Sequence, residues 1–234
     1  MPRPYRKPYW DTQPEYHFDP YASTPARSPA QPLIALLQTR SETTGPTFPR
    51  SIIKPGGADL TRSPGAKGEA LGERIVVSGR VLDESGRPVR NTLVEVWQAN
   101  SSGRYVNAND QHDAPLDPNF LGEGRTMTDD EGRYRVLTVK PGPYPWRNHY
   151  NAWRPAHIHF SLFGNAYTTR LVTQMYFPCD PLLPFDPIFN STADVNARNR
   201  LISCFDWETA MSEYATGYRF DIVLRGQLAT PWEK

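Results

Sequence analysis

The chain has 234 residues, and its 26 Lys and Arg nearly balance its 25 Asp and Glu, which leaves a formal net charge of +1. Because surfaces that bind nucleic acid are strongly basic, this balance argues against a polyanionic partner. The opening residues lack the apolar run of a secretory signal and no later stretch is long enough to span a bilayer, so we expect a soluble cytoplasmic protein.

Residues 1–73 are predicted to form a proline-rich arm. Half of the 24 prolines fall before residue 70, and proline is excluded from central strands and from helix interiors. The first segment is also dense in aromatic residues such as Tyr9, Trp10 and Tyr16, whereas disordered segments are poor in them. We therefore expect the arm to lie against the body of the protein or against a partner subunit.

From residue 74 onward, short β-type runs alternate with turn residues. Strands are predicted at residues 74–82, 92–98, 126–128, 134–139, 156–163, 171–177 and 218–224. The turns at 83–88 and 129–132 would close two hairpins. This pattern predicts an all-β chain in which residues 74–234 form a β-sandwich with little helix.

One helix is predicted, over residues 192–211, with Ser191 or Thr192 as its N-cap. Cys179 and Cys204 are the only cysteines, too few for a disulfide framework, and we interpret them as free thiols.

Two long loops leave the predicted strands, and each carries a tyrosine. Residues 99–105 end at Tyr105, and residues 140–147 include Tyr144 between two prolines that restrict its backbone. Loops on a rigid scaffold are where sites are usually assembled. Taken alone, each tyrosine is better explained as a ring that covers one end of the sandwich.

The strand at 156–163 carries the motif His157-Ile158-His159. Side chains alternate across a strand, so the two imidazoles point to one face while Ile158 and Phe160 point to the other, into the interior. The pair supplies half of a metal site. An isolated pair of this kind can also be two polar residues on a half-exposed strand.

The remaining ligands of such a site are not histidines, because no histidine follows His159 and the upstream ones, His17, His112 and His149, lack ligand-like spacing. If Tyr105 and Tyr144 complete the set, two phenolates favour a hard, highly charged cation such as ferric iron. From the residues alone this ferric site is a hypothesis.

The segments Pro-Gly-Pro-Tyr-Pro-Trp-Arg-Asn at 141–148 and Trp-Arg-Pro-Ala-His-Ile-His-Phe at 153–160 closely resemble the intradiol ring-cleaving dioxygenases. Further matching stretches lie at residues 26–29, 41–46, 91–100, 103–105, 115–120 and 218–226. The resemblance covers most of the chain and is greatest to members whose iron-bearing β chain acts on protocatechuate (3,4-dihydroxybenzoate).

This resemblance implies a non-heme Fe(III) centre with Tyr105, Tyr144, His157 and His159 as ligands. Tyr144 would also act in catalysis, as the ligand that leaves when the catechol binds. Arg154 would be the second catalytic residue and would stabilise negative charge on the ring. The positions that match the substrate pocket are Tyr21, Trp146, Gln174 and Ile188.

The implied reaction inserts both atoms of O2 into protocatechuate and gives 3-carboxy-cis,cis-muconate, a step of aromatic compound catabolism. The resemblance also implies a homologous iron-free α subunit that contributes part of the pocket, in a larger hetero-oligomer.

The chain departs from the pattern at residues 106–107, where relatives carry basic residues, and at 185–189, which leaves the pocket rim and the substrate open. One alternative is an intradiol enzyme for catechol or hydroxyquinol, although the proline-rich arm argues against the helical N-terminal segment of those enzymes. The other is a non-catalytic transthyretin-like sandwich module, since residues 79–88 and 129–134 also resemble such modules, which lack the four ligands.

Overall fold

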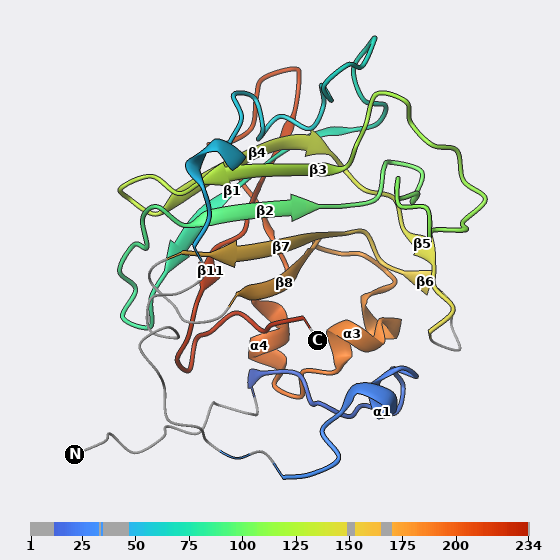
Figure 1. Cartoon of the computed structure of the whole chain (residues 1–234), viewed down its shortest axis with the longest axis vertical. Helices are drawn as coiled ribbons and strands as arrows, with labels where there is room; N and C mark the ends of the chain where they lie inside the picture. The colour runs from blue at the N-terminus through green and yellow to red at the C-terminus, as the bar shows by residue number, and fades with distance from the viewer. Residues whose placement is uncertain (1–11, 33, 35–46, 149–152, 165–169, 234) are drawn as a thin grey trace.

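The computed structural model describes residues 12–32, 34, 47–148, 153–164 and 170–233 (Figure 1). Strands in two stacked sheets make up most of the regular structure, and the helices are single short turns (Figure 1). The β-sandwich predicted from the sequence is confirmed.

The first sheet has five strands, in the order β11-β1-β10-β9, with β4 also paired to β1. Their bounds are β1 Arg74–Leu82, β4 Arg133–Val139, β9 Cys204–Phe205, β10 Thr216–Arg219 and β11 Ile222–Val223. Strand β1 runs antiparallel to β4 and parallel to β10 and β11. Where β10 gives way to β11, a Cβ on Gly79 would lie 1.9 Å from the carbonyl oxygen of Phe220, so only glycine fits.

The second sheet is antiparallel, with the strand order β3-β2-β7-β8, and it positions the histidines. Its strands are β2 Leu93–Trp97, β3 Glu123–Met127, β7 His157–Phe163 and β8 Leu171–Tyr176. A separate pair joins β5 (Tyr144–Pro145) to β6 (Trp153–Arg154), a small sheet that the sequence pattern did not predict.

The short helices are α1 Thr24–Arg27, η2 Arg50–Ile52, η3 Leu183–Phe185, α3 Pro187–Asn190 and α4 Val195–Asn199. Of these, α1, α3 and α4 lie below β8 in Figure 1, on the side where the chain ends.

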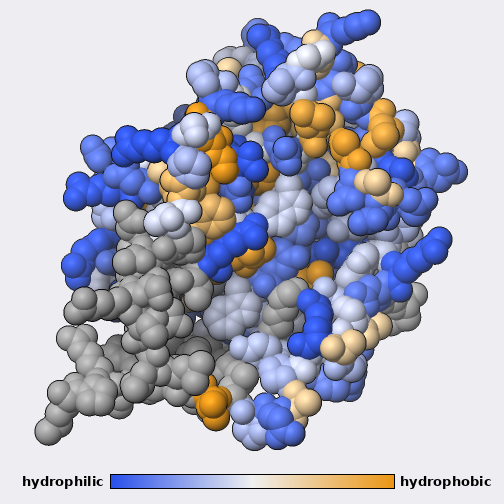
Figure 2. Space-filling view, viewed as in Figure 1, coloured by the Kyte–Doolittle hydropathy of each residue, from blue (hydrophilic) through white to orange (hydrophobic). Residues whose placement is uncertain are grey.

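The core lies between the two sheets and is built from alternate residues of their strands. Ile158, Phe160 and Leu162 of β7 are buried there, as predicted for the first two, and the ring of Phe160 packs against those of Tyr134 and Phe220. On the outer surface, hydrophobic residues form small groups between hydrophilic ones (Figure 2). Burial of the inward faces is the main stabilising term of such a sandwich.

The two predicted hairpins are wrong. Strands β1 and β2 lie in different sheets, and so do β3 and β4, because β1 pairs with β4 while β2 pairs with β3. A local turn signal brings two strands into succession, but in a sandwich the chain often crosses to the opposite sheet at that turn.

The predicted helix over 192–211 is also wrong in extent, since only α4 forms, and its N-cap is Asp194, whose Oδ1 accepts from the amide of Ala197 at 2.8 Å. The helix stops because the following residues pair with the end of β8: the amide of Tyr176 donates to Leu201 and the amide of Ser203 donates to Tyr176. The predicted strand 218–224 is split into β10 and β11.

The described part of the arm contacts the body at several points. The amide of Glu15 donates to the carbonyl of Ser191, and Leu60 is buried within the core between the sheets. The boundary at residue 73 stays a prediction, and residues 1–11 and the motif at 41–46 lie outside the described residues. None of the helices in the described ranges has the length and apolar character needed to cross a membrane.

Replacing Leu162 by Ala is expected to lower the free energy of unfolding by about 2–5 kcal/mol, since Leu162 is fully buried and its loss leaves a cavity. The matched control is Leu71→Ala, at a leucine that is 65% exposed, which should cost less than about 0.5 kcal/mol. Urea denaturation followed by fluorescence measures both, and equal losses would contradict this view of the core.

Candidate metal centre

Two loops that carry tyrosines meet because strands β2 and β4 end next to each other. The side chain of Gln98, just after β2, is buried and donates to the carbonyl of Val139 at the end of β4, at 2.8 Å. Beyond it, Gly103 adopts a φ of +77° and passes so close to Pro143 that a Cβ would lie 2.1 Å from the Pro143 carbonyl oxygen. Glycine therefore allows the two loops to touch.

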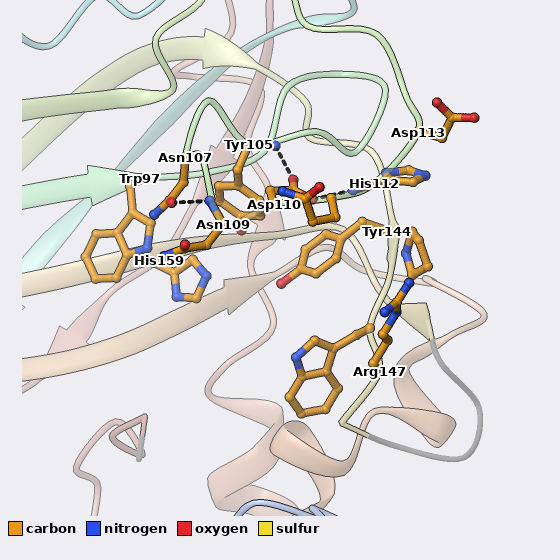
Figure 3. A pocket seen from close by; sticks show the side chains of 13 residues that line it. Trp97, Tyr105, Asn107, Asn109, Asp110, His112, Asp113, Tyr144, Arg147 and His159 are labelled. Atoms are coloured by element: carbon orange, nitrogen blue, oxygen red, sulfur yellow. Dashed lines mark hydrogen bonds between the residues drawn. The ribbon is translucent and has the colours of Figure 1, made fainter.

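Each tyrosine is then held by its own backbone partner. The amide of Tyr105 donates to Oδ2 of Asp110 at 2.8 Å, which closes the loop that carries it (Figure 3). Tyr144 lies on β5 directly opposite Arg154 on β6. The short β5–β6 pair therefore fixes the phenol of Tyr144 beside the guanidinium of Arg154.

The two histidines of β7 occupy the face of their strand away from the core, and both are nonetheless buried, at 1% and 8% exposure. Nδ1 of His157 lies 2.7 Å from the carbonyl oxygen of Pro155, and Nδ1 of His159 lies 2.8 Å from Oε2 of Glu233. Both partners can only accept, so Nδ1 carries the proton in each ring and Nε2 presents a lone pair.

The structure brings the four predicted ligands together from three segments. The ring centroids of His157 and His159 are 4.9 Å apart, those of Tyr105 and Tyr144 5.4 Å, and those of Tyr144 and His157 5.4 Å. The Tyr144 hydroxyl lies 3.3 Å from Nε2 of His157, and Figure 3 shows it pointing toward His159. The buried hydroxyl of Tyr105 has no well-formed hydrogen bond to a described residue, and it interacts with the hydroxyl of Tyr144.

Burial sets the protonation of this group when no ion is bound. It raises the pKa of Tyr105 well above the usual range and also raises the pKa of Tyr144, where the charge of Arg154 offsets part of the effect. Burial, together with Arg154 and His159, lowers the pKa of His157 well below its usual value, so this imidazole is neutral at pH 7. The phenols are likewise neutral.

Arg154 is the centre of a buried polar network beside the four side chains. Its guanidinium is 2% exposed and binds the fully buried carboxylate of Asp186 through two bonds, at 3.2 and 3.0 Å. Nη2 also donates to Gln174 and Tyr176, while Nη1 lies 3.4 Å from the Tyr144 hydroxyl. Burial alone would lower the pKa of Arg154, but Asp186 and the nearby phenols outweigh it and raise that pKa well above normal.

A cavity of about 670 Å³ opens onto the group. It is lined by Trp97, Tyr105, Asn107, Asn109, Asp110, Gln111, His112, Asp113, Tyr144, Pro145, Trp146, Arg147 and His159 (Figure 3). The indole of Trp97 stacks on His159 with ring centroids 4.8 Å apart, so it fixes one side of that imidazole.

Of the four residues predicted to line a substrate pocket, one lines this cavity and three do not. Trp146 lines the cavity, and the centroid of its ring lies 5.3 Å from the guanidinium carbon of Arg154. Tyr21 packs edge-on against Trp146, at 5.1 Å, and Gln174 contacts Arg154. Neither they nor Ile188, on α3, are among the described side chains that line this cavity.

The donor set fits a metal ion. The unpaired, buried hydroxyl of Tyr105 is costly by itself and needs a partner, and two Nε2 lone pairs lie on the same side. Among the described residues, no group of three or more His, Cys, Asp or Glu could hold a metal ion. A metal ion here would thus depend on the two phenols, whose anionic oxygens suit a hard trivalent ion such as Fe(III).

Sequence reasoning missed several residues of this site. Trp97 meets His159 through the pairing of β2 with β7, Glu233 comes from the C-terminal end of the chain, and Asp186 lies in the segment noted only as a departure from relatives. The alternation of side chains along the strand that ends at Trp97 could have indicated which face of the sheet Trp97 occupies. No local sequence signal marks Glu233 or Asp186.

Comparisons with known proteins identify the relatives of the chain. A family model described as Dioxygenase matches residues 43–226, and one described as Protocatechuate 3,4-dioxygenase beta subunit N terminal matches residues 5–39. The chain is 60% identical to the protocatechuate 3,4-dioxygenase beta chain of Burkholderia cepacia, over 96% of this chain and 95% of the relative. It is 32% identical to the protocatechuate 3,4-dioxygenase alpha chain of Pseudomonas putida, over 84% of this chain and 96% of the relative.

Among solved structures, hydroxyquinol 1,2-dioxygenase from Pseudomonas putida DLL-E4 superposes with a TM-score of 0.56 at 24% identity, covering 91% of this chain and 72% of that one. At this identity the likeness shows the shared fold.

Replacing Asp186 by Ala is expected to lower the free energy of unfolding by about 3–5 kcal/mol, because it leaves the buried charge of Arg154 unpaired. Asp186 also caps α3 by accepting from the amide of Ile188, a contact worth about 1 kcal/mol. Asp186→Asn keeps an oxygen for that cap, so it separates the two effects.

Asp130→Ala, at an exposed turn residue, is the control. Urea denaturation compares the three variants. If Asp186→Asn were as mild as the control, the ion pair would not be the dominant contact of Asp186.

Proposed function

The chain belongs to the intradiol ring-cleaving dioxygenase family, and from this membership we propose that it is the iron-bearing β chain of a protocatechuate 3,4-dioxygenase. The single observation that carries the proposal is the meeting of two phenols and two imidazoles around the unpaired hydroxyl of Tyr105. As a member of this family the chain is an enzyme, so the non-catalytic sandwich alternative is set aside.

Tyr105, Tyr144, His157 and His159 would hold a non-heme Fe(III). Two phenolates offset two of its three charges, and the third is left for a hydroxide or for substrate, which matters because a buried net charge is costly. Bound there, the ion would act as a Lewis acid toward the two oxygens of a catechol.

The residues around the ion have their own tasks. Oxygen Oη of Tyr144 is the group that would accept a proton from a catechol hydroxyl, since it faces the cavity and a phenolate is a competent base. Nη1 of Arg154 lies 3.4 Å from that oxygen, so its charge also stabilises negative charge that develops on the ring. Asp186 and Gln174 hold the guanidinium in place for this role.

The mouth of the cavity favours a catechol that carries a carboxylate. Arg147 lines the cavity, is exposed to solvent at its rim and has no ion-pair partner among the described residues (Figure 3). Its guanidinium can bind a carboxylate through two parallel hydrogen bonds. Of the four positions that match the substrate pocket of relatives, Trp146 lines this cavity. We propose Tyr21, Gln174 and Ile188 as further substrate-binding residues on the resemblance alone.

We also propose a homologous, iron-free α chain as the partner in a hetero-oligomer. The 32% identity to an alpha chain from Pseudomonas putida supports a common ancestry for two such chains. We expect this chain to need that partner for folding, and its cytoplasmic location stays a prediction.

The purified complex with its α chain should show a visible tyrosinate-to-iron charge-transfer band. Tyr105→Phe should weaken and shift that band, because it removes one of two phenolates. Tyr214→Phe is the control, since its ring lies against Arg74 and is not among the described residues that line the cavity. A folded, colourless and iron-free complex from iron-replete cells would contradict the proposal.

The ratio of kcat/KM for protocatechuate over catechol should exceed about 10, because a charged hydrogen bond to the carboxylate is worth about 1.5–3 kcal/mol. Arg147→Ala should lower that ratio toward 1, and Arg219→Ala, at an exposed arginine of β10, should leave it unchanged. Oxygen uptake measures all of these rates. A wild-type ratio below 1 would favour the catechol alternative.

A further inference from the structure

The C-terminal segment returns to the sheet that carries the histidines. It ends beside α3 and α4, below β8, in Figure 1. Along β8, the hydroxyl of Thr173 donates to the carbonyl of Pro231 and the amide of Glu233 donates to the carbonyl of Val172, both at 2.6 Å. The amide of Trp232 donates to Oε1 of Gln13 in the arm, at 2.9 Å. The tail is therefore fixed from both sides.

This attachment places one carboxylate behind a predicted ligand. Oε2 of Glu233 lies 2.8 Å from Nδ1 of His159, and the Glu233 side chain is only 19% exposed. One face of the same imidazole is covered by the indole of Trp97, which stacks on it. Ring position and tautomer are thus both fixed, and Nε2 carries the lone pair of a ring whose centroid lies 6.4 Å from that of Tyr105.

The two histidines differ in the partner of Nδ1. His157 donates to a neutral backbone carbonyl, that of Pro155, at 2.7 Å, whereas His159 donates to a carboxylate. A negative partner increases the electron density that an imidazole offers through its other nitrogen. His159 is therefore the stronger donor of the pair.

We propose that Glu233 is a positioning residue that sets the orientation and donor strength of His159 and so makes iron retention depend on the anchored C-terminal tail. This inference rests on the proposed function of the site as an iron centre. The charge of Glu233 can be changed without releasing the tail, because the backbone of Pro231, Trp232 and Glu233 also holds the tail in place.

The test compares Glu233→Gln and Glu233→Ala in the complete complex with the α chain. Glu233→Gln keeps the shape and an oxygen acceptor but removes the charge, and Glu233→Ala removes both. Glu208→Gln, at an exposed glutamate, is the matched control. The readouts are the position of the charge-transfer band and the rate at which a chelator removes iron.

Both Glu233 variants should shift the band to longer wavelength, because a weaker His159 donor leaves the ion more electron-poor. Glu233→Ala should in addition lose iron about 10–100-fold faster, the usual effect of removing such a partner. The control should match wild type. Wild-type band and release rate in both variants would overturn the inference while leaving the iron centre intact, whereas a wild-type complex without the band would overturn the proposed function itself.

Discussion

The buried contact between Arg154 and Asp186 is the interaction on which the rest of the site depends. A guanidinium that is 2% exposed has lost nearly all its hydration, and only a matched carboxylate with further acceptors compensates for that loss. Gln174 and Tyr176 are those acceptors, and they come from β8, while Asp186 caps α3. One side chain therefore ties the sheet to the helices and still leaves Nη1 facing Tyr144.

Strand β7 separates two environments within one short segment. Its inward residues join an apolar core. Two of its outward residues, His157 and His159, are also buried, because other side chains shield them from water. In such a setting each polar atom needs a partner, and among the described side chains of this network the Tyr105 hydroxyl and Nε2 of Gln174 lack one. The Tyr105 hydroxyl and the Nε2 atoms of the two histidines are the natural place for a bound ion, because their partners within the chain are absent or weak.

Segments from distant parts of the chain close the site. Tyr21 of the arm packs on Trp146, Gln13 of the arm holds the C-terminal tail, and that tail carries Glu233 to His159. The four proposed metal ligands lie in a span of about 55 residues, yet the side chains that support them come from both ends of the protein. Changes far from the ligands in sequence can therefore act directly on them.

The sequence by itself determined the sandwich class, the strand bearing the histidines and the four candidate ligands, because each depends on local alternation or on a compact motif such as residues 153–160. It did not determine which strands pair: the turns at 83–88 and 129–132 lead to opposite sheets, since turn chemistry fixes a reversal but not a partner. Asp186, Trp97 and Glu233 were likewise decided only by tertiary structure. Asp186 contacts Arg154 across 32 positions of the chain, whereas Trp97 and Glu233 contact His159 across 62 and 74 positions. A local sequence pattern cannot predict contacts at such separations.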